Sequence, residues 1–234
     1  MVELKKILSV WNMDIDEKRM NLFDRFYDLL IHYNSVMNLT TITRKDEVAS
    51  KHFADSIALL YYSDLTGRTL IDIGTGAGFP GIPIKIMCPD CEIVLVDSLK
   101  KRVGFLNDVI DELELSGISA VHGRAEDLAK DPKFRQSFDL VISRAVSNLR
   151  TLSEYCLPFA KPGGTFVSYK SGNIDDELQN SNNAIECLGG SFNRSERFFI
   201  PTTDYERTII FIDKVKDTPD KYPRKAGIPL KKPL

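Results

Sequence analysis

The sequence predicts an α/β protein with a mostly parallel seven-stranded sheet, helices on both faces of that sheet, and a helical extension before it. From residue 69 onward, short apolar runs rich in β-branched residues alternate with stretches of helical periodicity, which is typical of a parallel sheet. The last two apolar runs have no helix between them, which predicts an antiparallel edge. Residues 3–62 instead carry apolar side chains at helical spacing, such as Leu22, Phe26, Leu29 and Leu30.

The predicted elements of the core follow one another in regular order. The strands are expected over 70–73, 93–96, 118–121, 140–142, 166–169 and 207–212, with 191–199 as the hairpin partner of the last one. The helices between them are expected over 82–87, 100–115, 149–157 and 175–187. Open sheets of this kind bind ligands at the carboxyl ends of their strands, so the residues that follow each strand are candidates for a site.

Composition and termini exclude several classes of protein. No run of about 18 apolar residues occurs, so we expect no membrane span. Residues 1–6 lack the apolar segment of a signal peptide, and we therefore expect the protein in the cytoplasm. Cys88 and Cys91 form a CxxC with no second pair and no histidine nearby, so the sequence predicts no metal site.

A glycine-rich turn follows the first predicted strand. Gly74, Gly76 and Gly78 form a GxGxG pattern, and Asp72 stands two residues before the first glycine. Glycine permits a tight turn and a close approach of the backbone to a ligand. Dinucleotide-binding folds use GxGxxG to hold a pyrophosphate, whereas S-adenosylmethionine carries no phosphate. The pattern therefore predicts an S-adenosylmethionine site on a Rossmann-like class I methyltransferase fold.

Four residues after later strands are further candidates for this cofactor site. Asp97 ends the second strand, where a carboxylate accepts both ribose hydroxyls; the alternative is a helix cap. Ala125 and Glu126 follow the third strand and are the candidates for the adenine contact, although Glu126 also suits a helix start. Arg144 ends the fourth strand and is a candidate for contact with cofactor or substrate, the alternative being an exposed structural arginine. Phe79 is expected to pack against the cofactor or in the core.

The loop after the fourth strand excludes two reaction classes. It contains Ser143 and Arg144 where enzymes that methylate exocyclic amines carry an Asn/Asp-Pro-Pro-aromatic sequence. It also contains no cysteine, and Cys156 falls within a predicted helix, which disfavours addition of a thiolate to carbon 5 of cytosine.

Seven short motifs together resemble one family. The chain resembles the bacterial 16S rRNA guanine-N7 methyltransferases, methyltransferase G of the small subunit, also called glucose-inhibited division protein B. The motifs are residues 38–40 (NLT), 51–56 (KHFADS), 72–83 (DIGTGAGFPGIP), 96–102 (VDSLKKR), 122–126 (HGRAE), 143–146 (SRAV) and 222–227 (YPRKAG).

The resemblance implies a substrate and a set of contacts. It implies transfer of a methyl group from S-adenosylmethionine to N7 of a guanine in the decoding-region loop of 16S rRNA, as free rRNA or in the 30S subunit. N7 has a lone pair and no proton, so no general base is required; the catalytic residues stay unknown, with Arg144 as a candidate. We expect a monomer that does not bind membranes. The family's cofactor contacts fall on Gly74, Phe79, Ala125, Glu126 and Arg144, with Asp97 at the ribose.

Charge is distributed unevenly along the chain. We expect a helical region over 1–62, an S-adenosylmethionine-binding core over 63–213 and a basic tail over 214–234 that packs on the core or extends it. The whole chain has a net charge of −2, whereas residues 214–234 contain seven Lys or Arg and two acidic residues. This asymmetry suits either a phosphate-contacting surface or a solvated extension. The RNA-binding candidates are Lys100, Lys101, Arg102, Arg224, Lys225, Lys231 and Lys232.

Two other functions stay open on the sequence. A small-molecule or protein methyltransferase uses the same scaffold, and an assembly protein with a vestigial pocket needs no activity. We expect removal of the residues after Asp213 to weaken RNA methylation and to leave a small-molecule reaction almost unchanged.

Overall fold

The protein is built on a seven-stranded sheet, seen in a computed structural model that describes residues 1–144 and 147–234. The strands are β1 (Thr69–Ile73), β2 (Glu92–Asp97), β3 (Ile118–His122), β4 (Phe138–Arg144), β5 (Ala160–Ser171), β6 (Gly190–Phe199) and β7 (Glu206–Lys214). Their order across the sheet is β3-β2-β1-β4-β5-β7-β6. The first five are parallel, and β7 pairs antiparallel with both β5 and β6. The predicted fold class is confirmed.

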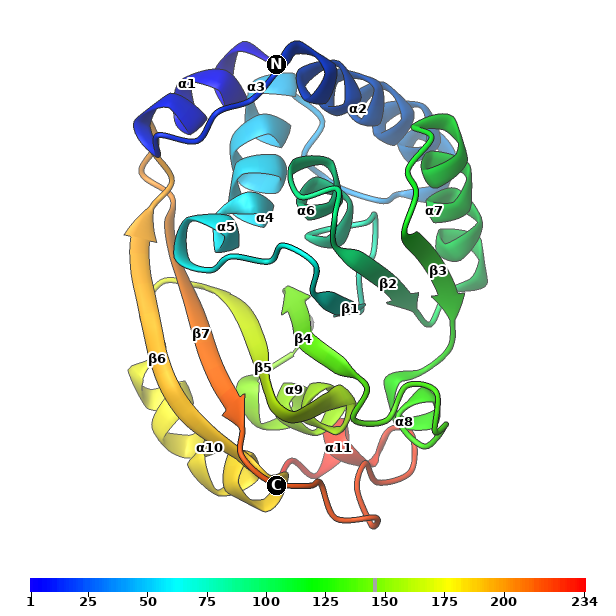
Figure 1. The fold of residues 1–234 in the computed structure, drawn as a ribbon, viewed down its shortest axis with the longest axis vertical. Helices are drawn as coiled ribbons and strands as arrows, with labels where there is room; N and C mark the ends of the chain where they lie inside the picture. The colour runs from blue at the N-terminus through cyan, green and yellow to red at the C-terminus, as the bar shows by residue number, and fades with distance from the viewer. Residues whose placement is uncertain (145–146) are drawn as a thin grey trace.

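Helices precede the sheet and connect its strands (Figure 1). They are α1 (Val2–Val10), α2 (Glu17–Met37), α3 (Lys45–Val48), the π-helix η1 (Ala49–Ala54), α4 (Asp55–Ile57), α5 (Leu59–Tyr62), α6 (Gly81–Met87), α7 (Lys100–Glu112), α8 (Ala125–Leu128), α9 (Leu149–Cys156), the 3-10 helix η2 (Leu157–Phe159), α10 (Asp175–Cys187) and α11 (Ile228–Lys231). Helix α7 ends before the predicted residue 115 because Glu114 adopts a left-handed conformation, with φ of 52°. None of the described helices is long and apolar enough to cross a membrane.

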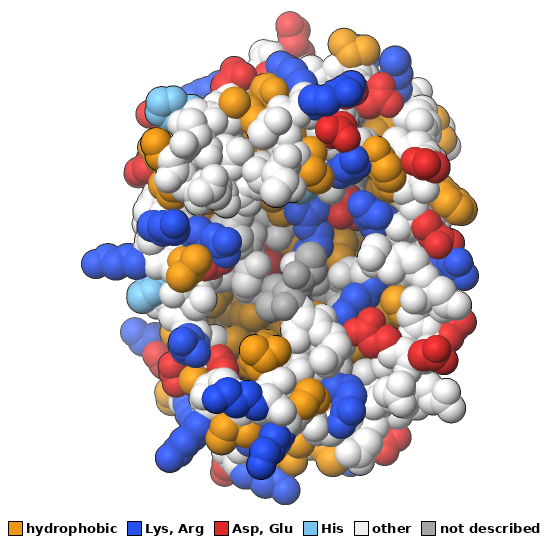
Figure 2. Space-filling model, turned by 180° about the vertical axis from the view of Figure 1, so that it is seen from behind, with side chains coloured by type: hydrophobic (Ala, Val, Ile, Leu, Met, Phe, Trp, Pro, Cys, Tyr) orange, Lys and Arg blue, Asp and Glu red, His pale blue; other side chains and the backbone are white. Residues whose placement is uncertain are grey.

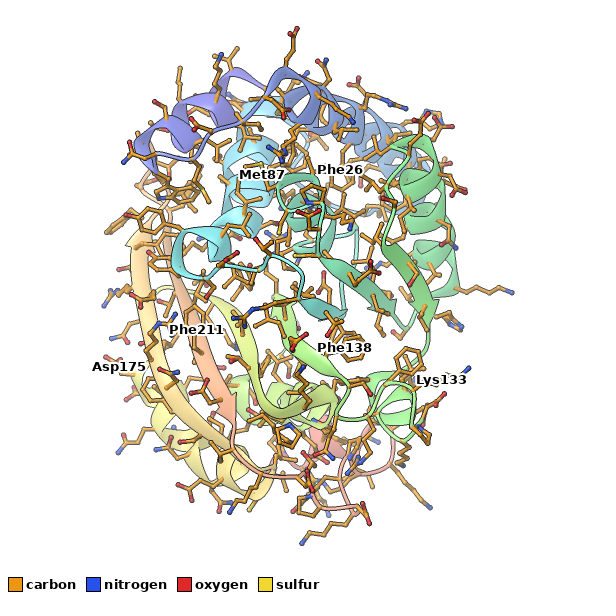
Figure 3. All side chains as sticks on the ribbon, in the orientation of Figure 1. Phe26, Met87, Lys133, Phe138, Asp175 and Phe211 are labelled. Atoms are coloured by element: carbon orange, nitrogen blue, oxygen red, sulfur yellow. The ribbon has the colours of Figure 1, made fainter. Side chains whose placement is uncertain are left out.

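Alternation along the strands creates a core on each face of the sheet. Leu70 belongs to the core that faces α1, α2, α6 and α7, and the next residue, Ile71, belongs to the core that faces α9 and α10. Figure 1 shows the sheet between these two groups of helices. In Figure 3, Phe26 points from α2 into the first core, while Lys133 and Asp175 lie at the periphery. The two-sided burial explains the nearly continuous apolar runs of the strands.

The order of the strands places a switch point between β1 and β4. The chain proceeds from β1 to β2 in one direction across the sheet, and from β4 to β5 in the other. Ligands of open α/β sheets bind outside the carboxyl ends of the strands at such a point. Residues 74–79 and Arg144 follow or end these two strands. Ala145 and Val146, the end of the SRAV motif, lie outside the described residues.

Candidate active site

The glycine turn of residues 74–78 begins at the end of β1. Gly74, Gly76 and Gly78 have φ of 74°, 63° and 89°, a region that glycine enters without steric cost. The amides of Gly74 and Thr75 donate to the carbonyl of Val96 on β2. A Cβ on Gly76 would meet no atom within 4 Å, whereas one on Gly78 would lie 2.4 Å from Ile82 Cδ1. Gly76 therefore borders open space, and Gly78 packs the turn against α6.

Asp97 links this turn to the start of α7. Its side chain is 4% exposed. Asp97 Oδ2 accepts a hydrogen bond from the Gly76 amide at 3.0 Å, and Oδ1 accepts one from the Leu99 amide at 2.8 Å. Arg102 Nη1 lies 3.3 Å from Oδ2. The two predicted roles of Asp97, ribose contact and helix cap, are thus compatible. The carboxylate caps the chain after β2 and also faces a cavity.

That cavity, called here the Asp97 cavity, has a volume of about 480 Å³. Its walls include Gly74, Asp97, Ala125 and Glu126. Glu126 is 5% exposed, and its Oε1 accepts a hydrogen bond from the amide of Gly227 at 3.0 Å. Gly227 and Leu230 of the C-terminal tail also line this cavity. With Arg144, which also lines this cavity, the structure thus brings five predicted cofactor residues together and adds two residues of the tail.

A second cavity, the Phe79 cavity, has a volume of about 560 Å³ and lies on the other side of the glycine turn. Gly74 and Arg144 line both cavities, so the cavities adjoin at these two residues. Residues of the N-terminal helices, β5 and β7 also line it, among them Lys51, His52, Asp55, Tyr169, Lys170 and Arg207. A hollow with Lys and Arg side chains at its edge is visible on one face of the molecule (Figure 2).

Arg144 is held in place by groups from the N-terminal helices. Its Nη1 lies 2.9 Å from Asp55 Oδ2 and 3.2 Å from the carbonyl of Lys51. The other oxygen of Asp55 accepts a hydrogen bond from Arg207 Nε at 3.0 Å. The guanidinium carbon of Arg144 also lies 5.1 Å from the centre of the Phe79 ring, within the range of a cation–π contact. One buried carboxylate therefore orients two arginines at the edge of the Phe79 cavity.

His52 is held as a neutral imidazole beside Arg144. Its ring stacks on Phe79 with a centroid distance of 4.7 Å. Burial and the neighbouring Arg144 lower the pKa of His52 to about 3. Arg144 Nη2 lies 3.4 Å from Nδ1, and Thr40 Oγ1 lies 2.8 Å from Nε2. Because arginine only donates, Nδ1 is the acceptor and Nε2 carries the proton.

Asp72 supports the glycine turn through hydrogen bonds. It is fully buried, and its Oδ2 accepts hydrogen bonds from Thr75 Oγ1 at 2.7 Å and from the Gly81 amide at 2.9 Å. Its Oδ1 has no hydrogen-bond partner among the described residues. Burial raises the pKa of Asp72 to about 7. Asp72 lines neither cavity and therefore acts on the backbone of the turn.

The predicted RNA-binding cations fall into two groups. Lys100, Lys101, Lys225, Lys231 and Lys232 are exposed. Arg102 pairs with Asp97, and Arg224 pairs with Glu154, whose side chain is fully buried, at an Nη2–Oε2 distance of 2.6 Å. These two arginines thus form ion pairs within the protein, and their contact with phosphate stays a prediction.

The tail packs on the core and is not a solvated extension. Lys214 is buried in β7, and its Nζ donates to the carbonyls of Leu157 and Leu188 at 3.1 and 3.0 Å. Burial lowers the pKa of Lys214 to about 7. Removal of the residues after Asp213 would take away these contacts and a wall of the Asp97 cavity. The deletion expected to distinguish RNA methylation from a small-molecule reaction is therefore unsuitable, a correction to our expectation.

The CxxC lies away from both cavities. Cys88 and Cys91 follow α6 with their sulfurs 3.1 Å apart, and Cys91 Sγ donates to the carbonyl of Leu65. Burial raises the pKa of Cys91 to about 12. Within residues 1–144 and 147–234, no three His, Cys, Asp or Glu side chains are grouped to hold a metal ion.

The Asp97 cavity fits the adenosine part of S-adenosylmethionine. Asp97 offers carboxylate oxygens to hydroxyls, and Val96, Ala125 and Leu230 offer apolar surface to a purine. Gly76, whose amide donates to Asp97, borders the adjoining Phe79 cavity. The volume lies within the range of small-molecule sites. Together with the sheet order and the glycine turn at its switch point, this donor set defines an S-adenosylmethionine-dependent methyltransferase.

Comparison with known proteins identifies the family. The profile of the rRNA small subunit methyltransferase G family, GidB, matches residues 19–200. Ribosomal RNA small subunit methyltransferase G of Lachnoclostridium phytofermentans is 54% identical over 223 residues, 95% of this chain and 92% of that protein. The protein of the same name from Desulforamulus reducens is 47% identical over 100% of this chain and 98% of its own length. The chain belongs to the rRNA small subunit methyltransferase G family.

Solved structures share the fold at low sequence identity. An S-adenosylmethionine-dependent methyltransferase from Aquifex aeolicus has a TM-score of 0.55 at 16% identity, covering 75% of this chain and 96% of that one. TYW2 of M. jannaschii in complex with AdoMet has a TM-score of 0.56 at 12% identity, with 75% and 80% covered. These likenesses support the class I fold.

Sequence reasoning missed several residues of the Phe79 cavity. Lys51, His52 and Asp55 lie in or beside the π-helix η1, and Arg207 lies on β7. The KHFADS motif was the one signal for the first three. No local pattern pointed to Arg207, because its place beside Asp55 depends on the antiparallel insertion of β7 next to β5.

Proposed function

We propose that this enzyme methylates N7 of a guanine in 16S rRNA, in the decoding-region loop of the small subunit. The observation that carries the proposal is the junction of the two cavities at Gly74 and Arg144. The Asp97 cavity has the donor set for adenosine, and the Phe79 cavity offers rings and cations to a base and its phosphates. Family membership supports ribosomal RNA as the substrate, and the motif resemblance supports N7 and the loop.

Methylation of guanine N7 requires positioning of the base and no removal of a proton. Guanine N7 has a lone pair and no proton, so the residues around it must align it with the methyl group. When bound, S-adenosylmethionine supplies an electrophilic methyl group on its sulfonium. Both His52 Nδ1 and the Asp55 carboxylate are engaged by Arg144, so neither is arranged as a free base.

Residue roles follow from this arrangement. We assign cofactor binding to Gly74, Gly76, Asp97, Ala125 and Glu126, and contact with the reacting groups to Arg144. Gly78 shapes the turn, and Phe79 and His52 together form the floor of the Phe79 cavity, where we place the base. We assign phosphate contacts to Lys51, Lys170 and Arg207 and to the exposed lysines of α7 and the tail.

The wider organisation is part of the same proposal. The helical region 1–62, the core 63–213 and the docked tail act together, because all three contribute to the two cavities. A ribosomal substrate supports a place in the cytoplasm.

The test uses small subunits from a strain that lacks this gene. The protein is incubated with methyl-labelled S-adenosylmethionine and either intact subunits or the extracted 16S rRNA, and the RNA is then cleaved chemically at N7-methylguanine. We expect label in 16S rRNA and one new cleavage in the decoding-region loop. Label on a protein or a small molecule, or RNA label without cleavage, would contradict the proposal.

A further inference from the structure

The C-terminal segment is attached to the core by many contacts. Arg135 donates to the carbonyls of Thr218 and Tyr222 at 2.8 and 3.0 Å. Arg224 is fixed by Glu154 on α9, and Thr151 Oγ1, also on α9, donates to the carbonyl of Pro229 at 3.2 Å. These bonds hold a segment of irregular backbone in a defined path, which ends against α9 beside the Asp97 cavity.

Two residues of this segment face the Asp97 cavity for different reasons. Gly227 has φ of 81°, and its amide donates to Glu126 Oε1. The left-handed turn at Gly227 starts α11, and Leu230 follows within that short helix. Leu230 lines the cavity and is still 62% exposed, while the adjacent Pro229 is buried. An exposed apolar side chain at a cavity edge contributes hydrophobic free energy only when a ligand removes it from water.

The position of Gly227 and Leu230 in the fold indicates which end of S-adenosylmethionine they contact. Glu126 and Ala125 lie after β3, two strands across the sheet from β1, which leads to Phe79, and Asp97 ends β2 between them. We propose that the C-terminal segment forms a wall of the adenosine site of S-adenosylmethionine, through the side chain of Leu230 and the backbone of Gly227. The segment then contributes to cofactor affinity independently of RNA.

The test measures binding without RNA. Leu230→Ser is compared with Ile228→Ser, because Ile228 is 39% exposed in the same helix α11 but lines neither cavity. We expect Leu230→Ser to weaken binding of S-adenosylhomocysteine roughly tenfold by calorimetry, from the apolar contact it removes. Ile228→Ser should bind as the wild type does. Unchanged melting temperatures establish that both variants are folded.

A second ligand assigns the contact to one end of the cofactor. 5′-Methylthioadenosine has the adenosine but lacks the amino-acid end, so Leu230→Ser should weaken its binding by the same factor. Loss of affinity for S-adenosylhomocysteine alone would place the contact at the amino-acid end and overturn the proposal. Wild-type affinity of Leu230→Ser for both ligands would also overturn it. Neither outcome bears on which RNA is methylated, so failure here is separate from failure of the proposed function.

Discussion

The Asp55 carboxylate lies 2.9 Å from Arg144 Nη1, an ion pair that joins the N-terminal helices to the end of β4. Both side chains are largely buried, with 6% and 13% exposed. Since Arg144 borders both cavities, Asp55, a residue far away in sequence, fixes the point at which the two cavities adjoin.

Replacement of Asp55 by Asn should lower kcat for rRNA methylation on the order of 100-fold, because Arg144 and Arg207 lose their shared carboxylate and their alignment. Affinity for S-adenosylhomocysteine should change much less, because Asp55 does not line the Asp97 cavity. Single-turnover kinetics and calorimetry measure the two effects. Asp176→Asn, at an exposed acid on α10, is the control. A wild-type rate for Asp55→Asn in a folded protein would refute this role.

Replacement of Asp97 by Ala should weaken binding of S-adenosylmethionine tenfold or more. The change removes a charge-assisted contact to the ribose and the bonds to Gly76 and Leu99 that shape the pocket. Calorimetry measures the effect, with Asp90→Ala as an exposed control just before β2. Equal affinities of the two variants would contradict the assignment.

The stability of the Asp72→Asn variant should depend on pH differently from that of the wild type. The pKa of Asp72 is raised to about 7 in the folded protein, from an ordinary value of 3.8. Burial therefore favours its neutral form, and the stability contributed by that form is lost progressively as the pH rises from about 4 to 7. Asn stays neutral and retains an acceptor for Thr75 and Gly81. From pH 5 to pH 8 the variant should gain about 3 kcal/mol relative to the wild type, measured by urea denaturation. A pH-independent difference would show that Asp72 does not titrate in this range.

Replacement of Arg224 by Ala should destabilise the fold by about 3–5 kcal/mol, because it leaves the buried carboxylate of Glu154 without its partner. The adjacent Lys225 is exposed, and Lys225→Ala should change the free energy of unfolding by less than about 0.5 kcal/mol. Chemical denaturation compares the two. Similar small effects would mean that the Arg224 ion pair contributes little.

The double replacement of Lys231 and Lys232 by Gln should weaken binding to unmethylated small subunits and reduce the salt dependence of that binding. Each lost phosphate contact lowers the slope of log K against log salt by about 1. Lys5 and Lys18, exposed on the N-terminal helices, are the control pair. An unchanged slope would remove these two lysines from the RNA-binding surface.

The core of the fold was predictable because its signals are local. Apolar runs such as 93–96 and the positive-φ glycines at 74–78 determine strands and a turn without help from distant residues. Asp97 and Glu126 were found because each follows a strand whose end must face the ligand side of the sheet. Their cofactor roles stay predictions until binding is measured.

The Phe79 cavity and the tail were less predictable, because tertiary packing decides them. Asp55 and Arg207 are 152 positions apart, and no sequence period joins them. In the tail, the count of seven cations treated Lys214 and Arg224 like the exposed lysines, although Lys214 is buried and Arg224 is paired with a buried carboxylate. Charge counts register residue types and contain no information on burial.

The hydrogen bond between Gly227 and Glu126 spans 101 positions of the chain. A ribosome adds about 5–20 residues per second, so the wall containing Gly227 emerges roughly 5–20 seconds after the wall containing Glu126. During that interval the strands that carry the glycine turn and Asp97 have already been synthesised, but one side of the pocket between them is missing. A nascent chain therefore lacks this wall of the Asp97 cavity until Gly227 and Leu230 have left the ribosome.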